Sequence, residues 1–186
     1  MAHQELLKLL QRFGARDEQD SGAARLFESF VREQVDCAQR ELQIGHLTGS
    51  AWLVSADGAR ILLTHHRKLD RWLQLGGHAD GASDMASVAL REAEEESGLT
   101  DLSVEPEIFD LDRHRIPEYD EMPGHWHYDM RFVVQANGGE EFAVSEESHA
   151  LAWREISEIA ADVDADASLQ RMAKRWVRRM ASHTER

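Results

Sequence analysis

The sequence predicts an α/β fold in which a mixed sheet is flanked by helices. Two observations lead to this prediction. Runs of alternating or continuous apolar residues, separated by turn residues, fill most of the chain between residues 48 and 156 and are typical of strands. Helical periodicity occurs before these runs, between them and after them. Helices and strands in this mixture bury their apolar faces against one another in layers.

Two amphipathic helices are predicted before residue 45. The first covers residues 3–13 and can end at Gly14, and the second is expected to be capped by Ser21. Their expected inward-facing residues are Leu6, Leu7, Leu10 and Phe13 in the first helix, and Leu26, Phe27, Phe30, Val31 and Val35 in the second. We therefore divide the chain into a helical N-terminal extension, residues 1–44, and a domain with a C-terminal helix, residues 45–186. The apolar faces fit packing on that domain or on a second copy in a homodimer.

The predicted strands follow in order along the chain. Asp57-Gly58, a strong hairpin signal, separates the runs GSAWLVS and RILLTHH. The later runs are WLQLGG, LSVEPEIFDLDRHR, HWHYDMRFVVQA and HALAWREI, of which the last leads into a short helix. A final helix is predicted near Ser168 to Met180, with Leu169, Met172, Trp176 and Met180 inward.

Residues 72–99 form the stretch around which we expect the functional site. The run WLQLGG enters a Gly-Gly turn, and a helix follows with Ser83 as its expected cap and Gly98 just past its end.

Three carboxylates crowd one side of this helix. Glu92 and Glu96 lie four residues apart and share a face, and Glu95 lies at its edge. Like charges at this spacing repel, whereas a hard divalent cation such as Mg²⁺ binds oxygen ligands. The pattern therefore predicts a metal site.

The same stretch resembles the Nudix box, the signature of the Nudix hydrolases. The matching positions are Gly77, Arg91-Glu92-Ala93, Glu95-Glu96 and Gly98-Leu99, whereas Ser83 stands where the family has Glu. The resemblance implies an α/β/α sandwich with a mixed sheet over roughly residues 45–159. It also implies an Mg²⁺- or Mn²⁺-dependent enzyme that hydrolyses a nucleoside diphosphate linked to another group, by attack of water on phosphorus.

The resemblance also implies roles for individual residues. The metal ligands are Glu92 and Glu96, with Glu95 binding directly or through water, and the backbone carbonyl near Gly77 is a further candidate. The general base is Glu95 or a loop carboxylate, Glu146 or Glu147. Arg91 is expected to hold the loop, with Asp80 or Asp84 in place of the missing Glu.

Ten histidines are many for a chain of 186 residues. His125 and His127 alternate along a predicted strand, so both point to one face, which Asp129 continues. Together with His78 they form a candidate second metal site, since imidazole suits Zn²⁺, Mn²⁺ or Fe better than Mg²⁺. Alternatively, His78 and His127 bind substrate by hydrogen bonds, with Arg71 at the phosphate, or transfer protons. His46 also precedes the first strand.

Two other functions stay open. GGHADG with a downstream His-x-His-x-Asp resembles a bacterial subgroup of Nudix proteins and is similar to type I isopentenyl diphosphate isomerase. In that enzyme a metal-binding His follows a catalytic Cys, whereas here the only cysteine is Cys37, far upstream. A catalytically silent Nudix-fold nucleotide sensor is the second alternative. Loss of the box carboxylates would favour a sensor, but all are present.

Composition narrows the expected partners. A net charge of −14 argues against sequence-independent binding of nucleic acid, and no apolar run reaches the length of a membrane span. A single cysteine forms no internal disulfide, which fits a reducing compartment. We therefore expect a cytoplasmic enzyme acting on a small diphosphate, with neither nucleic acid nor membrane as partner.

Overall fold

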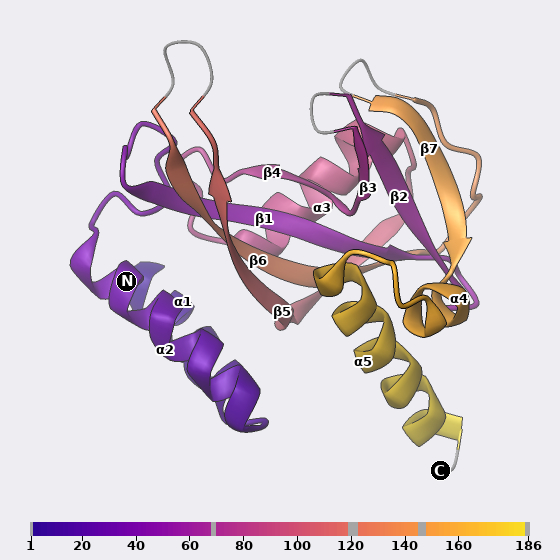
Figure 1. Ribbon diagram of the computed structural model, residues 1–186, viewed down its shortest axis with the longest axis horizontal. Coiled ribbons are helices and arrows are strands. Elements are labelled where there is room, and N and C mark those ends of the chain that lie inside the picture. The colour runs from indigo at the N-terminus through magenta and orange to yellow at the C-terminus, as the bar shows by residue number, and fades with distance from the viewer. Residues whose placement is uncertain (1, 68–69, 119–122, 145–147, 185–186) are drawn as a thin grey trace. The chain divides into compact units, whose positions relative to one another are not determined.

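The computed structural model describes residues 2–67, 70–118, 123–144 and 148–184 (Figure 1). Its elements are α1 (Ala2–Gly14), α2 (Glu18–Glu33), β1 (Gly45–Val54), β2 (Arg60–His66), β3 (Arg71–Leu73), β4 (Leu75–His78), α3 (Met85–Ser97), β5 (Leu102–Ile116), β6 (His125–Ala136), β7 (Ser148–Glu155), α4 (Ile156–Ala161) and α5 (Ala167–Thr184). The strands form a seven-stranded sheet in the order β3-β2-β1-β6-β5, with β4 paired to β1 and β7 paired to β2. The predicted α/β fold with a mixed sheet is confirmed.

Contacts divide the chain into two compact units. The first contains residues 1–51, 76–92 and 104–133, and the second contains residues 52–75, 93–103 and 134–186. Helix α3 runs continuously from one unit into the other. Within the described ranges, no helix combines the length and the apolar character that crossing a membrane requires.

The core of the first unit includes both N-terminal helices. Leu6, Leu10 and Phe13 of α1 are buried in the same apolar cluster as residues of β5 and β6. Tyr128 of β6 stacks on Phe30 with ring centroids 3.8 Å apart and meets the edge of Phe27 at 5.3 Å. Aromatic pairs of this kind contribute beyond their buried area. The chain itself therefore covers most of the apolar surface of these two helices. The homodimer, for which that surface was the argument, stays a prediction.

Helix α2 begins earlier than expected, and the cap predicted at Ser21 is wrong. Asp17 caps the helix, because its carboxylate accepts a hydrogen bond from the backbone N–H of Asp20 at 2.8 Å. Ser21 lies inside the helix, where its hydroxyl accepts a hydrogen bond from Arg25. The helix ends at Glu33, so Val35 lies beyond it and is 82% exposed, contrary to prediction. Leu26, also expected inward, is 38% exposed.

The second unit is built around β2. This strand pairs antiparallel with β1 across the predicted hairpin, where Gly58 has φ +71°, and it also pairs antiparallel with β3 and β7. Leu169, Met172 and Trp176 of α5 are buried, whereas Met180 is 39% exposed and only partly fits its prediction. Trp176 donates a hydrogen bond to the carbonyl of Gly58 at 2.8 Å, which fastens α5 to the hairpin turn.

Candidate active site and histidine cluster

In the first unit, the end of β4 meets the part of α3 that carries Arg91 and Glu92. Arg91 donates hydrogen bonds to the backbone carbonyl of His78 at 2.9 Å and to the carboxylate of Glu92 at 2.7 Å. A Cβ atom added to Gly77 would collide with that carboxylate. Glycine at this position therefore leaves room for Glu92 beside the backbone of β4. The Glu92 side chain is 15% exposed, so the site is only partly desolvated.

We expect Gly77→Ala to displace the Glu92 carboxylate and to weaken binding of Mg²⁺ or Mn²⁺ by about tenfold or more, the scale on which groups that orient metal ligands act. The fold should survive, because the colliding atoms are at the end of a flexible side chain. Isothermal titration with Mn²⁺ and thermal unfolding measure both effects.

The neighbouring glycine is the matched control. A Cβ at Gly76 would meet the Cα of Ser50 at 2.7 Å, and this backbone atom cannot move aside cheaply. Gly76→Ala should therefore lower the melting temperature, whereas Gly77→Ala should lower metal affinity. Equal melting temperatures for the two variants would contradict this interpretation.

Asp80 and Asp84, the two candidates to replace the family's Glu at position 83, form hydrogen bonds with other residues. Asp80 forms a bidentate ion pair with Arg40, and this hydrogen bonding lowers the pKa of the Asp80 carboxyl. Asp84 accepts hydrogen bonds from the backbone N–H of Ser87 at 3.2 Å and from its hydroxyl at 2.7 Å. Asp84 therefore caps α3, and the cap predicted at Ser83 is wrong by one residue.

The remaining predicted site residues lie in the second unit or outside the described residues. Glu95 and Glu96 follow Glu92 on α3, with Glu95 exposed and Glu96 partly buried. Arg71 is mostly exposed and contacts the carboxylate of Asp166 at 3.5 Å. The loop carboxylates Glu146 and Glu147 lie outside the described residues.

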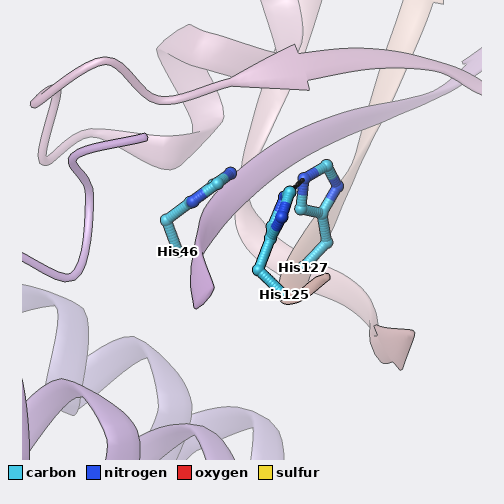
Figure 2. A group of neighbouring side chains, drawn as sticks. All are labelled: His46, His125 and His127. Carbon is cyan, nitrogen blue, oxygen red and sulfur yellow. Dashed lines mark hydrogen bonds between the residues drawn. The ribbon is translucent and has the colours of Figure 1, made fainter. Parts of the chain in front are cut away.

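Histidines from two strands of the first unit form a cluster. His46 lies near the start of β1, and His125 and His127 lie at the start of β6 (Figure 2). One ring nitrogen from each can be chosen so that all three lie within 4.8 Å of one another. The Nε2 atoms of His125 and His127 are 3.2 Å apart. The His78 ring lies 5.0 Å from that of His46 and 5.2 Å from that of His127, between centroids.

Burial keeps two histidines of this cluster uncharged. Desolvation, followed by the neighbouring imidazoles, lowers the pKa of His127 to about 2 and that of His46 to about 4. Both rings are therefore neutral at pH 7, which leaves each with a lone pair. Nδ1 of His125 lies 2.9 Å from the carbonyl oxygen of Pro123. Because a carbonyl only accepts, this Nδ1 carries a proton, and Nε2 faces His127 in the cluster.

Asp129 shares the strand face of His125 and His127 but serves a different network. Its carboxylate accepts hydrogen bonds from Thr48 at 3.0 Å, Ser50 at 2.7 Å and Arg131 at 2.7 Å. Among the described residues the third member of the group is His46, whereas the sequence suggested His78 or Asp129. The only sequence signal for His46 was its place just before the first strand.

Comparison with known proteins assigns the class. The family model of the NUDIX domain matches residues 46–176, and the chain belongs to this family. None of the curated proteins compared with the chain matches it.

Solved structures share the fold at low sequence identity. An Ap4A hydrolase of C. elegans in a binary complex has 16% identity and a TM-score of 0.56, covering 73% of this chain and 98% of its own. A MutT protein from Methanosarcina mazei Go1 has 17% identity and a TM-score of 0.56, covering 74% and 96%. A UDP-X diphosphatase has 17% identity and a TM-score of 0.52, covering 98% and 97%.

The family match confirms the predicted Nudix fold and the prediction of an enzyme of the Nudix pyrophosphohydrolase class. The match to the UDP-X diphosphatase spans nearly the whole chain, so the likeness in fold reaches the N-terminal helices. The GGHxDG-type subgroup and the division at residues 44 and 45 stay predictions.

Proposed function

We propose that this protein hydrolyses the diphosphate linkage of a nucleoside diphosphate joined to another group, with Mg²⁺ or Mn²⁺ held by carboxylates of α3. The observation that carries this proposal is the Glu92 carboxylate, which lies against Gly77 and accepts a hydrogen bond from Arg91. Glu92, Glu95 and Glu96 offer only oxygen atoms, and this donor set suits a hard divalent cation. When bound, such a cation neutralises phosphate oxygens and activates water.

The protein's own residues divide the remaining tasks. Glu92 and Glu96 hold the cation, since helical spacing puts them on one face, and Glu95 assists directly or through water. Arg91 positions the end of β4 through the carbonyl of His78, which keeps the Gly77 backbone at the site. Glu95 or Glu147 takes the proton of the attacking water. His78 and Arg71 are proposed to bind the substrate, whereas His127, the third candidate for that role, is assigned to a metal ion below.

A panel of diphosphates tests the reaction and the substrate class together. The panel contains nucleoside triphosphates, nucleotide sugars including UDP derivatives, dinucleotides, Ap4A and isopentenyl diphosphate. Structures named for Ap4A and for UDP-X share the fold, which justifies both compounds. Release of phosphate and nucleotide is followed with Mg²⁺ and with Mn²⁺. Turnover of one class supports the proposal, whereas binding without turnover across the panel would favour a nucleotide sensor.

The environment of the only cysteine distinguishes the proposed hydrolase from the alternative isomerase. Cys37 is 2% exposed, and burial raises the pKa of its thiol to about 11, so the thiol is inert at neutral pH. Cys37→Ala should therefore keep turnover within about twofold of the wild type, because no step needs a thiolate. Steady-state kinetics at matched folded protein check this result. A loss of activity with an unchanged melting temperature would reopen the isomerase mechanism.

We further propose that the enzyme is cytoplasmic, acts on small molecules and uses neither nucleic acid nor membrane as partner. The acidic net charge of −14 supports the absence of a nucleic-acid partner, since phosphate backbones attract basic surfaces.

A further inference from the structure

We infer that His46, His125 and His127 bind a divalent transition-metal ion, with Zn²⁺ the best match, through a set of ligands that does not include the carboxylates of α3. The three residues come from β1 and β6, and their imidazoles gather at one place in the first unit (Figure 2). This inference does not depend on the proposed hydrolysis.

The distances suit a tetrahedral ion. Two nitrogens bound to one zinc ion at about 2.0–2.1 Å are about 3.3 Å apart. The Nε2 atoms of His125 and His127 are 3.2 Å apart, and one nitrogen from each of the three residues can be chosen so that all lie within 4.8 Å of one another. Completing the set requires the His46 nitrogen to come within about 3.3 Å of the other two.

Packing alone does not explain why His46 is buried. The residue is 2% exposed, and neither ring nitrogen makes a well-formed hydrogen bond to the rest of the described protein. A backbone contact with Leu42 favours its protonated form, but this contact lacks hydrogen-bond geometry. A buried polar group without a proper partner costs roughly 1–3 kcal/mol. A metal ion at the cluster would supply the missing partner.

Surrounding groups prepare the ligands. The carbonyl of Pro123 accepts the Nδ1 proton of His125 and so orients its Nε2 lone pair inward, as hydrogen bonds from ligating histidines commonly do. Neutral imidazoles are the form that binds metal. Three nitrogen donors without a carboxylate favour Zn²⁺ over Mg²⁺ or Ca²⁺.

The three histidines would supply three of the four ligands of a tetrahedral ion. The rings of His78 and His114 lie beside the cluster, 5.2 Å and 5.5 Å from that of His127 between centroids. Three protein ligands with one water are typical of zinc sites that take part in chemistry, whereas closed four-ligand sites are structural.

Metal binding by the full-length protein tests the site. After removal of metal with a chelator, the protein is titrated with Zn²⁺ in competition with a chromophoric chelator, and with Co²⁺ as a visible-absorption probe. We expect one zinc ion per chain, with affinity tighter than micromolar. His46→Phe should weaken it by at least about 100-fold, since loss of an orienting group alone costs 10- to 100-fold. The metal-free variant should be no less stable than the wild type, because the buried unpartnered nitrogens are gone.

Two controls separate this site from the others. His149→Ala removes an exposed histidine and should leave zinc affinity unchanged. Glu96→Gln should keep zinc binding while losing hydrolysis. Zinc binding therefore tests the inference even if the proposed hydrolysis is not found. X-ray absorption on the wild-type zinc protein should show at least three imidazole ligands and needs no variant. Absence of stoichiometric zinc, fewer than two imidazoles, or wild-type affinity in His46→Phe would each overturn the inference.

Discussion

Replacing Glu96 by glutamine should lower turnover of the best substrate by about 100-fold or more, since even groups that only orient metal ligands cost 10- to 100-fold. Glutamine keeps the size of the side chain but removes the negative charge that the proposed site for Mg²⁺ or Mn²⁺ requires. Glu92→Gln should behave alike, because both residues lie on one face of α3. Turnover with saturating metal is the measurement.

The matched control for these variants is Glu94→Gln. Glu94 is exposed on the same helix and lies about half a turn away from Glu92, as 100° per residue requires. It should keep wild-type activity. A companion measurement is thermal unfolding with and without metal, in which binding to the folded state raises the midpoint. If millimolar Mg²⁺ and Mn²⁺ did not change the unfolding midpoint of the wild-type protein, the proposed carboxylate site would be excluded.

The largest loss of stability should come from Arg131→Met. Arg131 is 3% exposed in its side chain and contacts Asp129 at 2.7 Å, Asp110 at 3.2 Å and Asp112 at 3.5 Å. Burial disfavours its charge, but the three carboxylates outweigh burial and raise its pKa. Removing one partner of a buried ion pair costs about 3–5 kcal/mol, because the other charge stays buried. At 2–4 °C per kcal/mol the melting temperature should fall by roughly 10 °C.

An exposed ion pair gives the comparison for this prediction. Arg12 contacts Glu107 at 3.2 Å, and both side chains are about half exposed. Arg12→Gln should change the free energy of unfolding by less than about 1 kcal/mol. Urea denaturation of the three proteins measures the difference. If Arg131→Met cost no more than Arg12→Gln, the buried network would have no special role in stability.

Local patterns predicted the elements well where the residues themselves carry the signal. The run HWHYDMRFVVQA coincides with β6, and the Asp57-Gly58 turn joins β1 and β2 as expected. The start of α2 was less predictable. Serine and aspartate are equally good caps, and the sequence has one of each nearby, at Ser21 and Asp17.

The histidine cluster shows why the rest could not be predicted. Alternation along one strand put His125 and His127 together, but it also put Asp129 with them. The hydrogen bonds that Asp129 accepts from Thr48 and Ser50 depend on β1 lying beside β6. The same pairing brings His46 into the cluster from 79 positions away from His125 in the sequence. No pattern within a single run of residues contains that information.

The residues that match the family model do not include all the residues that pack around the histidine strand. The NUDIX match begins at residue 46, yet Phe27 and Phe30 of α2 support the ring of Tyr128, which sits between His127 and Asp129 on β6. The two N-terminal helices therefore act as an internal brace for the strand that carries the histidines. A change of sequence in these two helices can therefore affect the proposed zinc site through the position of one tyrosine ring.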